Sequence, residues 1–115
     1  MIASAKRLLK DAAVQGLSEE GKFSCVYSAA HILSLAALRW HGYRSSNRYL
    51  VFQCLLHTVS LEQGKCRILS KCHELRNVAE YEGQLDLTPQ LLNELTGITK
   101  ELLILVEGMG PVEKN

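Results

Sequence analysis

Apolar residues recur along the chain at intervals of three and four positions, the spacing of one face of an α-helix. The pattern is clearest within residues 18–41, where it runs through Phe23, Tyr27, Ala30, Leu33, Ala37 and Trp40. Nowhere does the chain alternate apolar and polar residues over the length of a β-strand. The sequence therefore predicts an all-α fold.

Five helices are expected, at about residues 4–15, 18–41, 47–59, 60–82 and 88–107. Each predicted helix begins at a residue whose side chain can cap it: Ser4, Ser18, Asn47 or Ser46, Ser60, and Thr88 followed by Pro89. Glycines mark several of the helix ends: Gly16, Gly42 and Gly83. The connections are short, so neighbouring helices should be antiparallel. This predicts an up-and-down bundle of four to five helices at 3–107 and a disordered tail at 108–115.

Composition narrows the class of protein. The chain has 115 residues, is 47% hydrophobic and carries a net charge of +1, as expected for one globular domain. That charge balance argues against strong nonspecific binding to nucleic acid. No stretch has the roughly 20 apolar residues of a membrane span, and no secretory signal is visible. We therefore expect a cytoplasmic protein that does not enter membranes, whose four cysteines are reduced and buried.

A polar cluster, HELRNVAEYEG at 73–83, closes the fourth predicted helix. His73, Arg76 and Glu80 lie along one line of the helix, because residues three and four apart share a face. Asn77 and Tyr81 form a second such pair on a neighbouring line. One interpretation is a solvated helix end with an incidental ion pair. The other is a half-buried arginine site that recognises an anion, as a guanidinium does well.

A second basic segment, YRSSNRY at 43–49, stands at the start of the third predicted helix. Arg44, Asn47 and Arg48 lie there, where the free backbone N–H groups of a helix start favour phosphate. The alternative is a simple turn with capping residues.

Other candidate chemistry is sparse. Cys66, Cys72 and His73 lack a recognised zinc spacing, and neither a glycine-rich phosphate loop nor a Ser-His-Asp order occurs. His31 should be a packed side chain and His57 a surface one. We expect neither a metal nor a cofactor.

The order of these segments resembles the HEPN superfamily, the higher eukaryote and prokaryote nucleotide-binding domains. The resemblance lies in AALRWHGYRSSNRYLVFQ followed by LRNVAEYEG, extends over about 3–107, and is greatest to small stand-alone prokaryotic members. It implies a helical bundle that forms a homodimer. Active members are metal-independent ribonucleases with an arginine, a polar residue and a histidine a few residues on. Arg76 and Asn77 match the first two.

The histidine position is occupied by Tyr81. A tyrosine with an unperturbed pKa near 10 is a poor base near neutral pH. His73 precedes Arg76 by one turn and could act only from the other side of the site. The resemblance therefore implies binding of RNA or a nucleotide rather than catalysis. It also implies a minimal nucleotidyltransferase as partner in a toxin–antitoxin pair, with Tyr81 as a possible acceptor for adenylylation.

Three hypotheses follow. The first is a homodimer that binds RNA or a nucleotide through residues from both polar segments: Arg76, Asn77, Glu80, Tyr81, Arg44, Asn47 and Arg48. The second is a diverged metal-independent endoribonuclease toxin, in which Arg76 stabilises the phosphorane and His73 or Tyr81 transfers the proton. The third is a non-catalytic structural or interaction dimer.

Overall fold

The computed structural model of the protein describes residues 1–45 and 47–110, apart from the side chain of Arg48. Its helices are α1 (Ile2–Ala12), α2 (Glu19–Trp40), α3 (Arg48–Gln53), α4 (Leu55–Thr58), α5 (Gln63–Glu82) and α6 (Pro89–Glu107). No strand occurs among the described residues, which confirms the all-α class. The third predicted helix is divided in two at Cys54. Of the predicted tail, residues 111–115 lie outside the described part of the chain.

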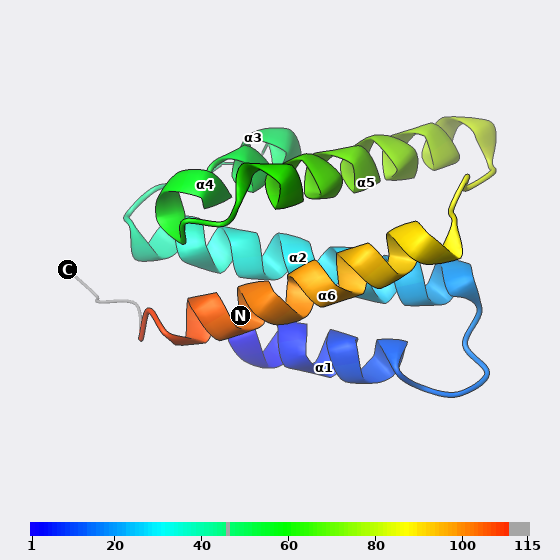
Figure 1. The fold of residues 1–115 in the computed structure, drawn as a ribbon, viewed down its shortest axis with the longest axis horizontal. Helices are drawn as coiled ribbons and strands as arrows, with labels where there is room; N and C mark the ends of the chain where they lie inside the picture. The colour runs from blue at the N-terminus through cyan, green and yellow to red at the C-terminus, as the bar shows by residue number, and fades with distance from the viewer. Residues whose placement is uncertain (46, 111–115) are drawn as a thin grey trace.

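The four long helices run up and down along the 43 Å axis of the bundle (Figure 1). Helix α2 is central and packs against α1 on one side and α6 on another, while α3 and α4 lie beside α5 at one end. Helices α2 and α6 begin at the same end, which is also where α1 finishes. Within the described residues, no helix is long and apolar enough to cross a membrane.

The core lies along α2. Its four alanines at 29, 30, 36 and 37 are at most 6% exposed, and such small side chains allow α1 and α6 to approach closely. The largest fully buried side chains come from the helices around it and from α2 itself: Tyr27, Leu33, Phe52, Leu55, Leu69, Leu95 and Leu102. Burial of each leucine contributes roughly 1.5–3 kcal/mol, so packing rather than helix propensity holds the bundle together.

Three of the predicted N-caps are confirmed. The hydroxyl of Ser18 accepts a hydrogen bond from Gly21 N (3.0 Å), and that of Thr88 accepts one from Leu91 N (3.1 Å) with Pro89 opening α6. The side-chain oxygen of Asn47 accepts from the backbone of Tyr49 and Leu50. At the other ends, Gly42 and Gly83 have φ of +85° and +71°, a conformation in which glycine is favoured.

The predictions for Ser4 and Ser60 are wrong. Helix α1 begins at Ile2 and ends at Ala12, so Ser4 lies inside it and Gln15 lies beyond it. Ser60 has φ +56° in the turn after α4, and α5 begins only at Gln63. The turn places Leu61 at 1% exposure, with its N–H donating to Leu55 O. Burial of this leucine therefore sets the chain path, and the serine cannot cap the helix.

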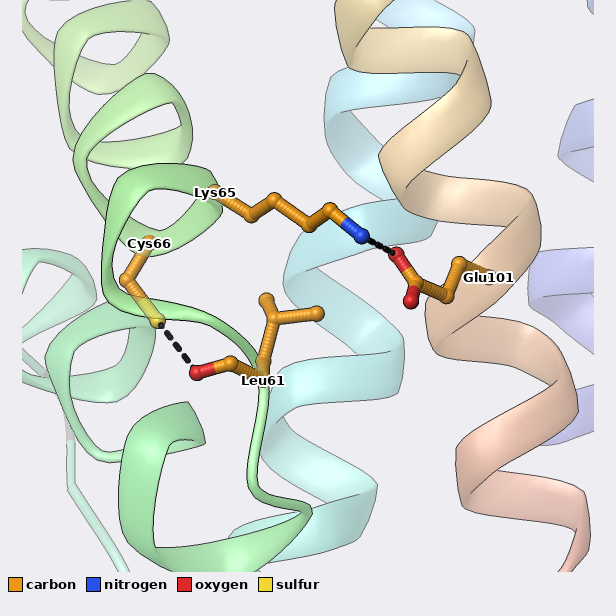
Figure 2. Close-up of polar contacts among 4 residues, drawn as sticks. All are labelled: Leu61, Lys65, Cys66 and Glu101. Atoms are coloured by element: carbon orange, nitrogen blue, oxygen red, sulfur yellow. Dashed lines mark hydrogen bonds and ion pairs between the residues drawn. The ribbon is translucent and has the colours of Figure 1, made fainter.

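Two contacts fix the start of α5 (Figure 2). The Cys66 thiol donates to Leu61 O at 3.7 Å, and Lys65 Nζ lies 2.7 Å from Glu101 Oε2 on α6. The hydrogen bond to the Glu101 carboxylate raises the pKa of Lys65 above its usual value. The ion pair lies at the surface, so its contribution to stability is small.

The cysteines differ in burial. Cys66 and Cys72 are buried, as predicted, whereas Cys25 and Cys54 are half-buried. Burial raises the pKa of Cys72 to about 12, and it also raises that of Cys66. A native Cys72 thiol therefore stays protonated at pH values where the unfolded chain releases the proton. Its contribution to stability is complete below about pH 9 and is lost as the pH rises towards 12.

Thiol labelling tests these differences in burial and thiol pKa between the cysteines. At pH 8 iodoacetamide should modify Cys25 and Cys54 first and leave Cys72 unmodified until the chain unfolds. The reason is that only the thiolate reacts, and a pKa of about 12 leaves roughly 10⁻⁴ of Cys72 in that form. Peptide mass mapping over time gives the order. Modification of Cys72 at the rate of Cys54 under native conditions would contradict it.

Candidate functional site

The polar cluster of α5 faces α2 and is organised around Tyr27. This tyrosine is 1% exposed, and its hydroxyl lies 2.9 Å from Nδ1 of His73. The other ring nitrogen of His73, Nε2, lies 3.2 Å from the amide nitrogen of Asn77. The amide N–H₂ of Asn77 can only donate, so it donates to Nε2, while Nδ1 contacts the Tyr27 hydroxyl. Both nitrogens of His73 are thus engaged within the protein.

Aromatic contacts hold the same histidine in place. Its ring lies nearly parallel to that of Tyr27, with centroids 6.5 Å apart and 14° between the planes. Phe52 of α3 meets both rings edge-on, at 5.8 Å from Tyr27 and 6.4 Å from His73. Three elements, α2, α3 and α5, therefore fix the imidazole.

Arg76 uses the ring of Tyr27 as a support. Its guanidinium carbon lies 5.3 Å from the ring centroid, within the range of a cation–π interaction. Its Nη1 lies 3.2 Å from Glu80 Oε1, which confirms the predicted contact one turn along the helix. The side chain of Arg76 is 36% exposed, so the guanidinium is half-buried and held on two sides.

Arg76 lines a cavity of about 240 Å³ between α2 and α5. Its other walls are Glu20, Phe23, Ser24, Ala79, Glu80 and Leu85. One cation and two carboxylates give this cavity a formal charge of −1. An anion entering it would therefore have to replace a carboxylate as the partner of Arg76.

Asn77 and Tyr81 do not form the predicted pair. Asn77 turns towards His73, and no hydrogen bond joins it to Tyr81 in the part of the chain that the structure describes. Tyr81 is 91% exposed at the end of α5. Its hydroxyl is therefore accessible from solvent, away from the cavity that Arg76 lines.

The second basic segment lies elsewhere. Arg44 is exposed and lines a separate, largely apolar cavity with Tyr43 and Leu50. That site follows the C-terminal end of α2, about 20 Å along the helix from the level of Tyr27. Asn47 uses its side-chain oxygen to cap α3, as the turn interpretation requires. The structure does not bring Arg44 and Asn47 to Arg76, and the side chain of Arg48 lies outside the described atoms.

The remaining histidines lie outside this site. His31 is half-buried with its ring edge-on to Phe52 at 6.1 Å, as expected of a packed side chain. His57 is exposed, as predicted. Nε2 of His41 lies 2.9 Å from Thr58 O and so joins the end of α2 to α4. No group of three or more His, Cys, Asp or Glu side chains suited to a metal ion occurs in residues 1–45 and 47–110.

Sequence reasoning missed the contribution of α2 to this site. Tyr27 was expected only as part of an apolar stripe, and Glu20 was not among the candidate site residues. The position of Tyr27 on the apolar stripe was one available signal, because the hydroxyl of a buried tyrosine usually has a hydrogen-bond partner. The sequence did not identify that partner.

The arrangement orients the Arg76 guanidinium beside a small cavity and holds the His73 imidazole through its contacts with Tyr27 and Asn77. No protein-family model, no curated protein and no solved structure matches this chain. The HEPN relationship therefore stays a proposal, and a functional hypothesis has to be built on the geometry around Arg76.

Proposed function

We propose that this chain is a HEPN-like homodimeric protein that binds RNA or a nucleotide through a phosphate at Arg76. The observation that carries the proposal is the position of the guanidinium. It is half-exposed on the wall of a cavity and held by the Tyr27 ring at 5.3 Å and by Glu80 at 3.2 Å. A preoriented guanidinium loses little conformational entropy when it binds an anion, and its planar fork matches phosphate.

Glu80 acts in this proposal as an exchangeable partner. An Arg-to-Glu pair at i,i+4 in this order stabilises an exposed helix by at most a few tenths of a kcal/mol. A charge-assisted hydrogen bond to phosphate contributes about 1.5–3 kcal/mol. The phosphate therefore displaces the Glu80 carboxylate, which is 59% exposed and free to swing into solvent. The Tyr27 ring keeps the guanidinium in place during the exchange.

The outer face of α5 is the proposed contact surface between two copies. Val78 is 44% exposed there. Tyr81, at the end of α5, is 91% exposed, which makes its hydroxyl accessible to a nucleotidyltransferase. A toxin–antitoxin pair with such an enzyme, in which Tyr81 accepts a nucleotidyl group, is the cellular role that fits this proposal.

Arg76→Ala tests the site. Fluorescence anisotropy with a labelled single-stranded RNA, and calorimetry with AMP, should show affinity at least about tenfold weaker than for the unmodified protein, since one charge-assisted contact is lost. Arg7→Ala is the matched control, because Arg7 is an exposed arginine on α1. Equal affinities for Arg76→Ala and the unmodified protein would overturn the proposal. A change only in dimer dissociation would favour a purely structural dimer.

A metal-independent ribonuclease is the second candidate. It is suggested by the position of His73 one turn from Arg76 on α5, and it requires a ring nitrogen of His73 to exchange its contact with Tyr27 or Asn77 for the substrate. In that reaction Arg76 would stabilise the phosphorane and His73 would transfer the proton. Cleavage of RNA in EDTA, lost in both Arg76→Ala and His73→Ala with the fold intact, would establish it. RNA binding without cleavage would favour the binding protein.

A further inference from the structure

A second cavity, of about 340 Å³, lies between α1, α2 and α6 and shares no residue with the Arg76 cavity. Leu9, Val26 and Leu92 give it an apolar floor. It extends from the region where α1 finishes and α2 and α6 begin, at one end of the bundle in Figure 1, along α6 as far as Lys100. Small-molecule sites have volumes of roughly 300–1,000 Å³, so this cavity suits a ligand at the small end of that range.

The rim of this cavity is positively charged. Lys22 and Lys100 line it with one carboxylate, Glu19, which gives a formal charge of +1. Neither lysine forms an ion pair with a carboxylate among the described residues. Lys22 is half-buried as a whole residue, and Lys100 is exposed. The cavity at Arg76, by contrast, has a formal charge of −1.

The helix ends add to this charge. The first turns of α2 and α6 both line the cavity, through Lys22 and Pro89, and each helix start carries a partial positive charge of about half an elementary charge. The last turn of α1, at Ala12, contributes an opposite partial charge that offsets one of them. The sum of side chains and helix ends stays positive. Asn93 adds a side-chain amide at the same rim.

We propose that this cavity binds a small amphiphilic anion, with a carboxylate or phosphate head and a short apolar tail. The head lies between the ammonium groups of Lys22 and Lys100, and the tail lies on the floor of Leu9, Val26 and Leu92. The hydroxyl of Thr96, which also lines the cavity, already donates to Leu92 O at 2.8 Å. The two ammonium groups and the Asn93 amide therefore supply the donors for the head.

Calorimetric titration of the full chain with octanoate, octyl phosphate and octanol tests the two halves of this proposal. Octanoate or octyl phosphate should bind saturably, and the tighter of the two identifies the head group. Octanol has the tail without the charge and should bind at least about tenfold more weakly than the better anion. Failure of both anions to bind, or equal binding of octanol, would overturn the proposal.

Charge-removing variants locate the site. Lys22→Met and Lys100→Met remove the charge and keep most of the length of the side chain, and each should weaken anion binding about fivefold or more. Lys71→Met is the matched control, since Lys71 is exposed on α5 and outside the cavity. Arg76→Ala should bind the anions like the unmodified protein, which separates this site from the proposed RNA site. Anion binding unchanged in both cavity variants, with circular dichroism confirming their fold, would contradict the assignment.

Discussion

Replacing Leu102 by alanine is expected to lower the free energy of unfolding by about 2–5 kcal/mol, the range for leucine truncation in a packed core. Leu102 is 0% exposed on α6, the helix that packs along α2. Domains of this size have total stabilities of about 5–15 kcal/mol, so one substitution should remove a large fraction. Urea denaturation followed by circular dichroism gives the difference.

Ile104 provides the matched control on the same helix. It lies two residues further along α6 and is 71% exposed. Ile104→Ala removes apolar surface without leaving a cavity, so its effect should stay within about 0.5 kcal/mol. If Leu102→Ala and Ile104→Ala lowered the free energy of unfolding by similar amounts, a different side of α6 would face the core. That result would contradict the fold.

The second large effect is expected at Tyr27. Tyr27→Ala should destabilise the protein by about 3–5 kcal/mol, since it empties an aromatic position in the core. It should also weaken RNA binding, because the support beneath the Arg76 guanidinium disappears. Tyr27→Phe keeps the ring and removes only the partner of His73 Nδ1, so a loss of about 1–3 kcal/mol is expected. Denaturation and anisotropy titrations on both variants measure the two effects.

Tyr27→Phe and Tyr27→Ala together distinguish the effect of the aromatic ring on RNA binding from that of the hydroxyl. RNA affinity should survive in Tyr27→Phe and fall in Tyr27→Ala, because Arg76 contacts the ring at 5.3 Å and not the oxygen. Equal loss of affinity in both variants would show that the hydrogen bond to His73, rather than the aromatic support, positions the site.

Local signals predicted most of the fold. Ser18, Asn47 and Thr88 each cap the helix that the sequence assigned to them, because a cap depends only on residues within one turn. The same reasoning was wrong at Ser60. There Leu61 enters the core, a preference set by residues of other helices, and α5 begins only at Gln63. Tertiary packing thus decided this boundary.

The candidate site was predictable only along α5. Helical spacing predicted the Arg76–Glu80 contact, but the hydrogen bond between Tyr27 and His73 joins residues 46 positions apart. Its existence depends on how α2 and α5 pack. The same packing placed Glu20 in the cavity of Arg76 and left Arg44 at the far end of α2. Spacing along one helix carries no information about these neighbours.

The most direct test of phosphate recognition at Arg76 is the dissociation constant of the RNA for Glu80→Gln. The amide is nearly the same size as the carboxylate but gives up the ion pair at 3.2 Å and changes the formal charge of the cavity from −1 to 0. If a phosphate displaces Glu80, this variant should bind RNA severalfold more tightly than the unmodified protein, the opposite of Arg76→Ala. Binding that is unchanged or weaker would contradict recognition of phosphate at this position.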